Sequence, residues 1–370
     1  MERYNRTVAE VWELWKPRAR LGIYPFEHTT YADNEQALAG LTSLDRDAWA
    51  AAYSALAGPH EDAAREAEAR GDRGAAQEEY LHAYALYHMA RFPTTNSPGK
   101  LAAYRKAREN YLKAARFFEI PMQRVEIPFV GRPGEGSAVV GYLRCPQGVG
   151  PWPILIQWGG IDGYKEEMTA AAEMFVRAGV ATLAMDGPGV GESPLRGSED
   201  AERLWDAVFG WAAVRPDLDA RRLAAWGNST GGYWAAKLAH THRERIAAAV
   251  AHGGCAHYAF TPEWIEQAQH GEYAFEEAET LAYAFGKQSF EEWVDYAPRL
   301  SLLAQGILDR PCAPLLLVNG IHDSTFPIRD MYLLLEHGSP KSARFYDAGH
   351  MGITPDTHPM ILRWVKERLA

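Results

Sequence analysis

From residue 121 onward the chain alternates between short apolar runs and helical segments, and this alternation restricts the fold more than any other feature. Short, continuous apolar runs are typical of strands that are buried on both faces of a sheet. Such strands are expected at 153–158, 180–185, 223–227, 246–251, 314–320 and 343–347, after two antiparallel strands at 124–130 and 137–146. The sequence therefore predicts an α/β fold in which helices cover both faces of a mostly parallel central sheet.

The chain has a different character before residue 121, where almost every segment is typical of a helix. Segments rich in Ala, Glu, Arg and Leu occur at 46–57, 60–70, 74–92 and 99–118, and PTTNSPG separates the last two. We predict a helical N-terminal domain at 1–120 and a catalytic domain at 121–370. An acidic, aromatic stretch at about 256–310 interrupts the alternation and is expected to be a helical insertion.

Charge and cysteine content exclude several classes of function. The 370 residues include 48 Asp and Glu against 38 Lys and Arg, a net charge of −10 that disfavours nucleic acid as a partner. The three cysteines form no CxxC pair, so neither a disulfide framework nor a zinc site is indicated. The charged N-terminal residues contain no apolar stretch, so we expect no signal peptide. The sequence printed here contains no apolar run of about 18 residues, so we expect no membrane-spanning segment. We therefore expect a cytoplasmic protein that does not bind a membrane.

One sequence motif indicates a catalytic residue. Gly227-Asn228-Ser229-Thr230-Gly231 has the form G-x-S-x-G, and it follows a buried strand and precedes a helix. This context is that of a nucleophile elbow, a sharp turn that exposes the serine hydroxyl above the carboxyl end of the sheet. The small residues on both sides of Ser229 allow so tight a turn. Ser229 is therefore the candidate nucleophile.

A serine hydroxyl needs a base and an acid that orients the base. In folds with this turn the chain order is serine, acid, histidine. Asp323 follows the run at 314–320 and His350 follows the run at 343–347, so both are expected at the carboxyl ends of strands, where such sheets keep their active sites. We predict a triad of Ser229, Asp323 and His350. The competing acids are Asp330, expected on a helix, and Asp347, expected in a turn at a strand end. The competing histidines, which lack the strand-end placement, are His322, His337 and His358.

Acyl chemistry also requires hydrogen-bond donors for the developing oxyanion. The backbone N–H of Thr230 is one candidate, and the loop after 153–158 should supply the other, either Ile161 or Gly160.

The segment DGPGVGES at 186–193 superficially resembles a dinucleotide-binding loop, but its Pro188 lacks an N–H and no helix follows directly. The sequence has no HExxH motif, and we expect neither a metal nor a cofactor.

Taken together, these features resemble the α/β-hydrolases. The whole chain is similar to a narrower group that includes 2,6-dihydroxypseudooxynicotine hydrolase, esterases of the fermentation-respiration switch protein type and fungal hydrolases that shorten polyketide pigments. The similarity rests on four segments: YHMARF at 87–92 in the helical region, GGIDGYKEE at 159–167, DGPGVGES at 186–193 and GNSTGGYWAAK at 227–237. It implies the same triad and a cap formed by the N-terminal helices.

The resemblance also indicates a reaction. Several members of the group hydrolyse a carbon–carbon bond next to a ketone, and others hydrolyse esters. We expect an acyl C–C hydrolase acting on an aromatic or polyketide-like small molecule, with carboxylic ester hydrolysis as the alternative. A helical-repeat interaction protein with an inactive hydrolase fold is a further alternative, although no 34-residue period recurs. A homodimer is left open.

The substrate pocket is less well defined by the sequence. Twelve Trp and 18 Tyr suit either a large core or an aromatic pocket. Tyr84, Tyr87 and His88 lie about one turn apart on an expected cap helix, and Tyr164 lies in the GGIDGYKEE segment; these four are the candidate pocket residues. An acidic residue that contacts substrate could be Glu263, Glu266 or Glu272, and none is preferred.

Overall fold

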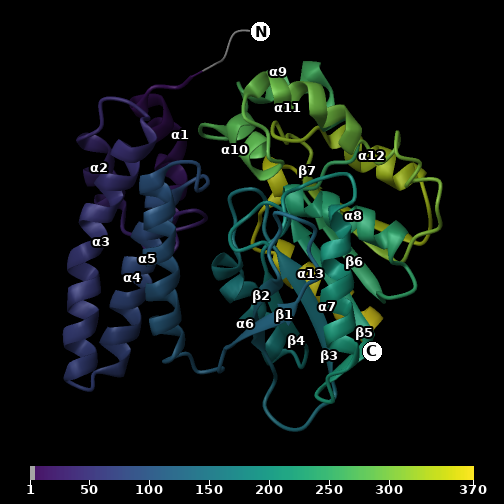
Figure 1. Ribbon diagram of the computed structural model, residues 1–370, viewed down its shortest axis with the longest axis horizontal. Coiled ribbons are helices and arrows are strands. Elements are labelled where there is room, and N and C mark those ends of the chain that lie inside the picture. The colour runs from purple at the N-terminus through teal and green to yellow at the C-terminus, as the bar shows by residue number, and fades with distance from the viewer. Residues whose placement is uncertain (1–4) are drawn as a thin grey trace. The chain divides into compact units, whose positions relative to one another are not determined.

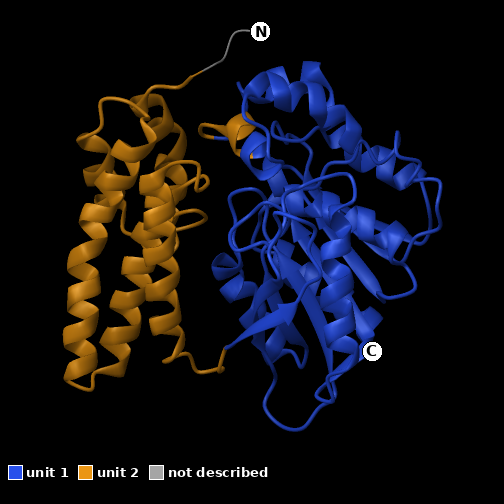
Figure 2. Ribbon diagram, in the orientation of Figure 1, with its two compact units in different colours: residues 1, 123–273, 281–370 blue, residues 2–122, 274–280 orange. Residues whose placement is uncertain are grey.

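The computed structural model describes residues 5–370, which form two compact units (Figure 2). One unit contains residues 123–273 and 281–370. The other contains the described residues up to 122, together with 274–280. None of the helices within residues 5–370 has both the length and the hydropathy needed to cross a membrane.

The first unit is built on an eight-stranded sheet (Figure 1). Its strand order is β1-β2-β4-β3-β5-β6-β7-β8, antiparallel at β1–β2 and β2–β4 and parallel at every later pair. The strands are β1 Gln123–Pro128, β2 Ala138–Arg144, β3 Trp152–Trp158, β4 Ala181–Met185, β5 Leu218–Asn228, β6 Ala248–His252, β7 Leu315–Gly320 and β8 Lys341–Tyr346. The predicted α/β fold with a mostly parallel sheet is confirmed.

Side chains along each strand alternate between the two faces of this sheet, so both faces carry apolar side chains, and helices cover both. Leu155 and Trp226 point to one face and form a buried cluster with Phe175 of α6 (Thr169–Arg177) and Val365 of α13 (Thr357–Leu369). On the other face the Trp158 ring lies 4.7 Å from that of Trp205. The helices α7 (Leu204–Ala213) and α8 (Thr230–Thr241) pack there, and α12 (Ile328–Glu336) connects β7 to β8. Three short helices occupy the expected insertion: α9 Pro262–Ala268, α10 Glu277–Ala284 and α11 Phe290–Tyr296.

The second unit is helical. Its helices are α1 Val8–Leu21, α2 Tyr31–Ala39, α3 Arg46–Ala69, α4 Arg73–Arg91 and α5 Pro98–Ala115. The side chains of Asp45, Asp72 and Ser97 accept backbone N–H groups at the starts of α3, α4 and α5, as N-caps should. Two helices were expected at 46–57 and 60–70, and this division is wrong: α3 continues through Pro59. Packing of α3 along α4 and α5 holds the helix together where its own backbone bonds are interrupted.

A short segment from the later part of the chain belongs to this helical unit. Glu276, in residues 274–280, lies 3.0 Å from Nζ of the buried Lys100 and forms a second ion pair with Arg46. The ring of Phe275 lies 4.9 Å from that of Trp49. The segment is therefore held by both charge and aromatic packing.

Candidate active site

Ser229 stands in a strained turn between β5 and α8. Its φ of 55° and ψ of −127° are unusual for a residue other than glycine. A Cβ on Gly227 would lie 2.0 Å from the carbonyl oxygen of Gly231, so glycine is required at that position. The backbone N–H of Ser229 donates to the carbonyl of His252 at 2.7 Å, which ties the turn to the end of β6. The turn thus has the geometry of a nucleophile elbow.

The structure brings Ser229, His350 and Asp323 together at the carboxyl ends of β5, β8 and β7. Ser229 Oγ lies 2.8 Å from His350 Nε2, and His350 Nδ1 lies 2.8 Å from Asp323 Oδ2. In the sequence, His350 is 27 residues from Asp323 and 121 residues from Ser229. Such a chain of contacts is the arrangement in which an imidazole can accept a proton from a serine hydroxyl.

The Asp323 carboxylate is buried and held by several donors. Asn319 Nδ2 donates to Oδ2 at 2.8 Å, and the backbone N–H groups of Thr325 and Phe326 donate to Oδ1 at 2.8 and 2.9 Å. The ring of Phe326 also meets the His350 imidazole edge-on at 5.5 Å. Both the acid and the imidazole are therefore fixed in orientation before any substrate arrives.

The competing acids lie elsewhere. Asp330 is buried on α12, where the backbone N–H groups of His257, Tyr258 and Ala259 donate to it at 2.7–3.1 Å. Burial nevertheless raises its pKa. Asp347 is exposed and pairs with His322 at 2.7 Å. Neither carboxylate takes part in the group formed around Ser229.

The competing histidines have other partners as well. His358 packs its ring against Trp226 at 5.5 Å, and burial lowers its pKa. His337 lies half-buried at the end of α12, after β7 and before β8. His252, a residue that the sequence did not single out, is fully buried, and desolvation lowers its pKa to about 3. It therefore stays neutral between the Asn228 side chain and the backbone of Met351.

The loop after β3 passes directly beside Ser229. A Cβ on Gly160 would lie 3.1 Å from Ser229 Oγ, so a side chain there would obstruct the hydroxyl. A Cβ on Gly159 would lie 1.9 Å from the carbonyl oxygen of Gly163, which shows how tightly the loop folds. Ile161 is buried in this loop, and Thr230 is buried at the start of α8. The predicted oxyanion donors thus belong to segments that flank the nucleophile.

A buried ionic cluster anchors the same loop. Lys165 Nζ lies 2.8 Å from Asp186 Oδ2, 2.9 Å from Glu192 and 3.2 Å from Glu166. Asp186 also accepts the backbone N–H groups of Lys165 and Glu192 at 2.9 and 2.8 Å. Desolvation, with the nearby charge of Asp186, raises the pKa of Glu166 to about 7. Lys165 of the segment 159–167 therefore contacts the segment 186–193. Both segments are among the four on which the resemblance rests.

Glu272, one of the three acidic candidates among which the sequence indicated no preference, lies next to His350. Its Oε1 accepts the backbone N–H of His350 at 2.9 Å and both the N–H and the hydroxyl of Ser324 at 3.2 Å. A Cβ on Gly349 would lie 2.5 Å from Glu272 Oε2. The other two candidates, Glu263 and Glu266, are exposed on α9. No periodicity marks Glu272, because it lies in a loop of the insertion.

Carboxylates around His350 change its titration. Burial by itself would lower the pKa of this imidazole, but the charge and hydrogen bond of Asp323 outweigh burial, and Glu272 and Asp162 add to the effect. The net result is a pKa above the usual 6.5. Asp162 is itself held by the hydroxyl of Tyr273, which donates to it at 3.0 Å. The site therefore stabilises the protonated imidazole.

The four candidate pocket residues are all buried. Tyr164 belongs to the loop after β3, where its N–H donates to Glu167. In the helical unit the Tyr87 hydroxyl donates to Glu61 at 3.4 Å, and the ring of Tyr84 lies 5.2 Å from that of Tyr111. His88 Nδ1 lies 2.8 Å from the Arg91 guanidinium. Their contact with substrate stays a prediction.

The fold and the serine turn define an α/β-hydrolase. The chain belongs to the FrsA-like esterase family, whose model matches residues 38–341. The protein is accordingly a hydrolase, as the resemblance implied.

Individual relatives agree with this assignment. Esterase FrsA of Escherichia fergusonii is 29% identical over 307 residues, which cover 79% of this chain and 70% of the relative. The crystal structure of 2,6-dihydroxy-pseudo-oxynicotine hydrolase superposes with a TM-score of 0.76 at 22% identity, covering 98% of this chain and 96% of the other. Wild-type AbyA5 superposes with a TM-score of 0.74, also at 22% identity, covering 98% and 99% of the two chains. At these identities the two solved structures show a shared fold.

Proposed function

We propose that the protein is a serine hydrolase in which Ser229 is the nucleophile, His350 the base and Asp323 the group that orients the base. The observation that carries this proposal is the unbroken chain from Ser229 Oγ through the His350 imidazole to the Asp323 carboxylate, with both contacts at 2.8 Å. A serine hydroxyl becomes a strong nucleophile when a neutral imidazole accepts its proton at this distance.

The reaction then runs in two halves. Ser229 Oγ bonds to the substrate carbonyl carbon while His350 Nε2 takes the hydroxyl proton. The bond to the leaving group breaks, and the imidazolium gives that proton to the departing atom. Water next attacks the acyl-serine, His350 takes one of its protons, and the release of a carboxylic acid restores the Ser229 hydroxyl. One water is consumed in each cycle.

The negative charge on the carbonyl oxygen needs donors during both halves. In the proposed site these are the backbone N–H of Thr230 and that of Ile161 or Gly160. The closeness of Gly160 to Ser229 Oγ supports this assignment, because the loop leaves room for the carbonyl where a side chain would stand. Preorganised donors of this type contribute more to acyl transfer than most other single features.

For the scissile bond we propose a carbon–carbon bond next to a ketone in an aromatic small molecule. When a carbon–carbon bond breaks in this way, the electron pair stays on the departing carbon. Such a carbanion is a poor leaving group and must be protonated as it departs. In the proposed site the His350 imidazolium, held by the Asp323 carboxylate, would supply this proton. The fold shared with 2,6-dihydroxy-pseudo-oxynicotine hydrolase supports an aromatic substrate of this kind. Carboxylic ester hydrolysis is the second candidate, favoured by the esterase name of the family model and of the curated relatives.

A matched pair of substrates separates the two candidates. One is an aryl ketone with hydroxyls on the ring, and the other is the ester with the same acyl group and ring. In D2O, C–C hydrolysis releases an arene that carries one deuterium at the carbon formerly joined to the carbonyl. The proposal predicts this product from the wild type and none from Ser229→Ala. Turnover of the ester alone would assign the esterase function, and equal turnover by Ser229→Ala would contradict the serine mechanism.

A further inference from the structure

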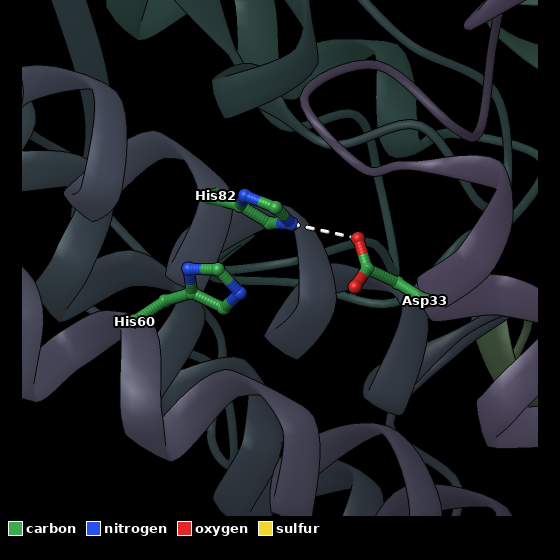
Figure 3. Close-up of side chains that lie close together, drawn as sticks. All are labelled: Asp33, His60 and His82. Atoms are coloured by element: carbon green, nitrogen blue, oxygen red, sulfur yellow. Dashed lines mark hydrogen bonds and ion pairs between the residues drawn. The ribbon is translucent and has the colours of Figure 1, made fainter.

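Three side chains on different helices of the helical unit converge (Figure 3). They are Asp33 on α2, His60 on α3 and His82 on α4, and one oxygen or nitrogen of each lies within 4.8 Å of the others. His82 Nε2 lies 2.8 Å from Asp33 Oδ2. The imidazoles of His60 and His82 lie nearly parallel, with ring centres 3.7 Å apart. All three side chains are half-buried.

Outer contacts orient two of these side chains. His60 Nδ1 lies 2.6 Å from Glu79 Oε2, which favours the tautomer with its proton on Nδ1 and a lone pair on Nε2. Asp33 Oδ2 accepts both the N–H and the hydroxyl of Thr30, at 2.8 and 2.6 Å, and is fixed at the start of α2. A carboxylate behind a ligating histidine, and donors behind a ligating carboxylate, are the usual surroundings of metal ligands in proteins.

We propose that Asp33, His60 and His82 form a binding site for a divalent transition-metal ion, with Zn²⁺ as the preferred ion. Two imidazoles and one carboxylate are a donor set that zinc takes readily, and water would complete four-coordination. Ligand atoms about 2.0–2.1 Å from a tetrahedral zinc lie about 3.3 Å from one another. The three ligand atoms lie within 4.8 Å of one another, and His82 Nε2 is 2.8 Å from Asp33 Oδ2, so side-chain rotations that bring some of these atoms closer and move others apart would reach this spacing.

Charge supports a cation at this place. Two imidazoles stacked at 3.7 Å repel each other when both are protonated, whereas two neutral rings offer lone pairs and no charge. Asp33 and the nearby Glu79 supply negative charge on two sides. A metal ion would neutralise these carboxylates without placing a proton on either ring. It would also tie α2, α3 and α4 together, so metal binding should stabilise the fold.

The test uses the full-length, tag-free protein after removal of metals with a chelator. Zinc is titrated in competition with a chromophoric chelator, and thermal unfolding is recorded with and without zinc. The proposal predicts one zinc per chain and a higher melting temperature with zinc. His82→Ala and Asp33→Asn should abolish both effects. Glu79→Gln should weaken zinc binding by about 10–100-fold, because it removes only an outer contact.

The matched control is His242→Ala. His242 also pairs with an aspartate, Asp206, at 3.3 Å, but its ring packs on that of Phe209, and within residues 5–370 no second imidazole stacks on it. This variant should bind zinc as the wild type does, which shows that loss of an imidazole paired with an aspartate does not by itself reduce zinc binding. If His82→Ala fails to fold, the conservative His60→Gln takes its place. The proposal is overturned if the wild type binds no zinc at micromolar concentration, or if the Asp33 and histidine variants bind it unchanged.

Discussion

The carboxylate of Glu272 accepts the backbone N–H of His350 at 2.9 Å, so a charge from the insertion lies directly beside the imidazole that faces Ser229. Together with Asp323 and Asp162 it overcomes the effect of burial and raises the pKa of His350 above its usual value. The neutral imidazole is the form that can accept the proton of Ser229. The rise of kcat/KM with pH should therefore have its midpoint above 6.5.

Glu272→Gln tests this relationship. Removing the negative charge makes the imidazolium less stable, so the midpoint of the kcat/KM profile should move to lower pH. Glu263→Gln is the matched control, because Glu263 is exposed on α9, and its profile should coincide with that of the wild type. A midpoint in Glu272→Gln that is unchanged or higher would show that the charge does not act on the base.

Replacement of histidines one at a time tests the choice of base. His350→Gln should reduce kcat by several orders of magnitude, because no other imidazole contacts Ser229 among residues 5–370. His322→Gln and His358→Gln should retain the wild-type rate, since His322 pairs with Asp347 at the surface and His358 packs on Trp226. Steady-state kinetics on a common ester provide the comparison. Inactivation by either control variant, with an active His350→Gln, would place the base elsewhere.

The buried cluster around Lys165 predicts a large loss of stability. Lys165→Met leaves Glu166 and Asp186 buried without their cation, and breaking a buried pair in this way costs about 3–5 kcal/mol. The free energy of unfolding, measured with urea, should fall by that amount at pH 7. The matched change Arg177→Met removes an exposed partner of Glu173 on α6 and should stay within about 1 kcal/mol of the wild type. Equal losses in both variants would contradict a special role for the cluster.

Much of the fold could be predicted from the sequence because its signals are local. Continuous apolar runs indicated the parallel strands, and the strand–turn–helix context of Gly227 to Gly231 indicated the turn at Ser229. The proximity of Ser229, Asp323 and His350 followed from one further rule: carboxyl ends of neighbouring parallel strands meet at one edge of a sheet.

Other features depend on contacts between distant segments, and the sequence carries no local sign of them. Glu272 contacts His350, which is 78 residues away in the sequence. The residues around Glu272 in the sequence give no sign that it, and not Glu263, makes this contact. The sequence indicated separate helical segments at 46–57 and 60–70, yet α3 continues from Arg46 to Ala69. Asp33, His60 and His82 come together only because α2, α3 and α4 are neighbours, so spacing along the chain does not reveal them.

The most direct test of the proposed function is the mass of the intact protein after treatment with a fluorophosphonate, which reacts with activated serine hydroxyls. Ser229 should take up one phosphonyl group per chain, located by peptide mapping, because its hydroxyl lies 2.8 Å from the imidazole of His350. Ser229→Ala should stay unlabelled, keep the melting temperature of the wild type and lose hydrolysis by ~10⁶-fold. An unlabelled wild type, a label on another serine, or activity in Ser229→Ala above about a hundredth of the wild type would contradict the account.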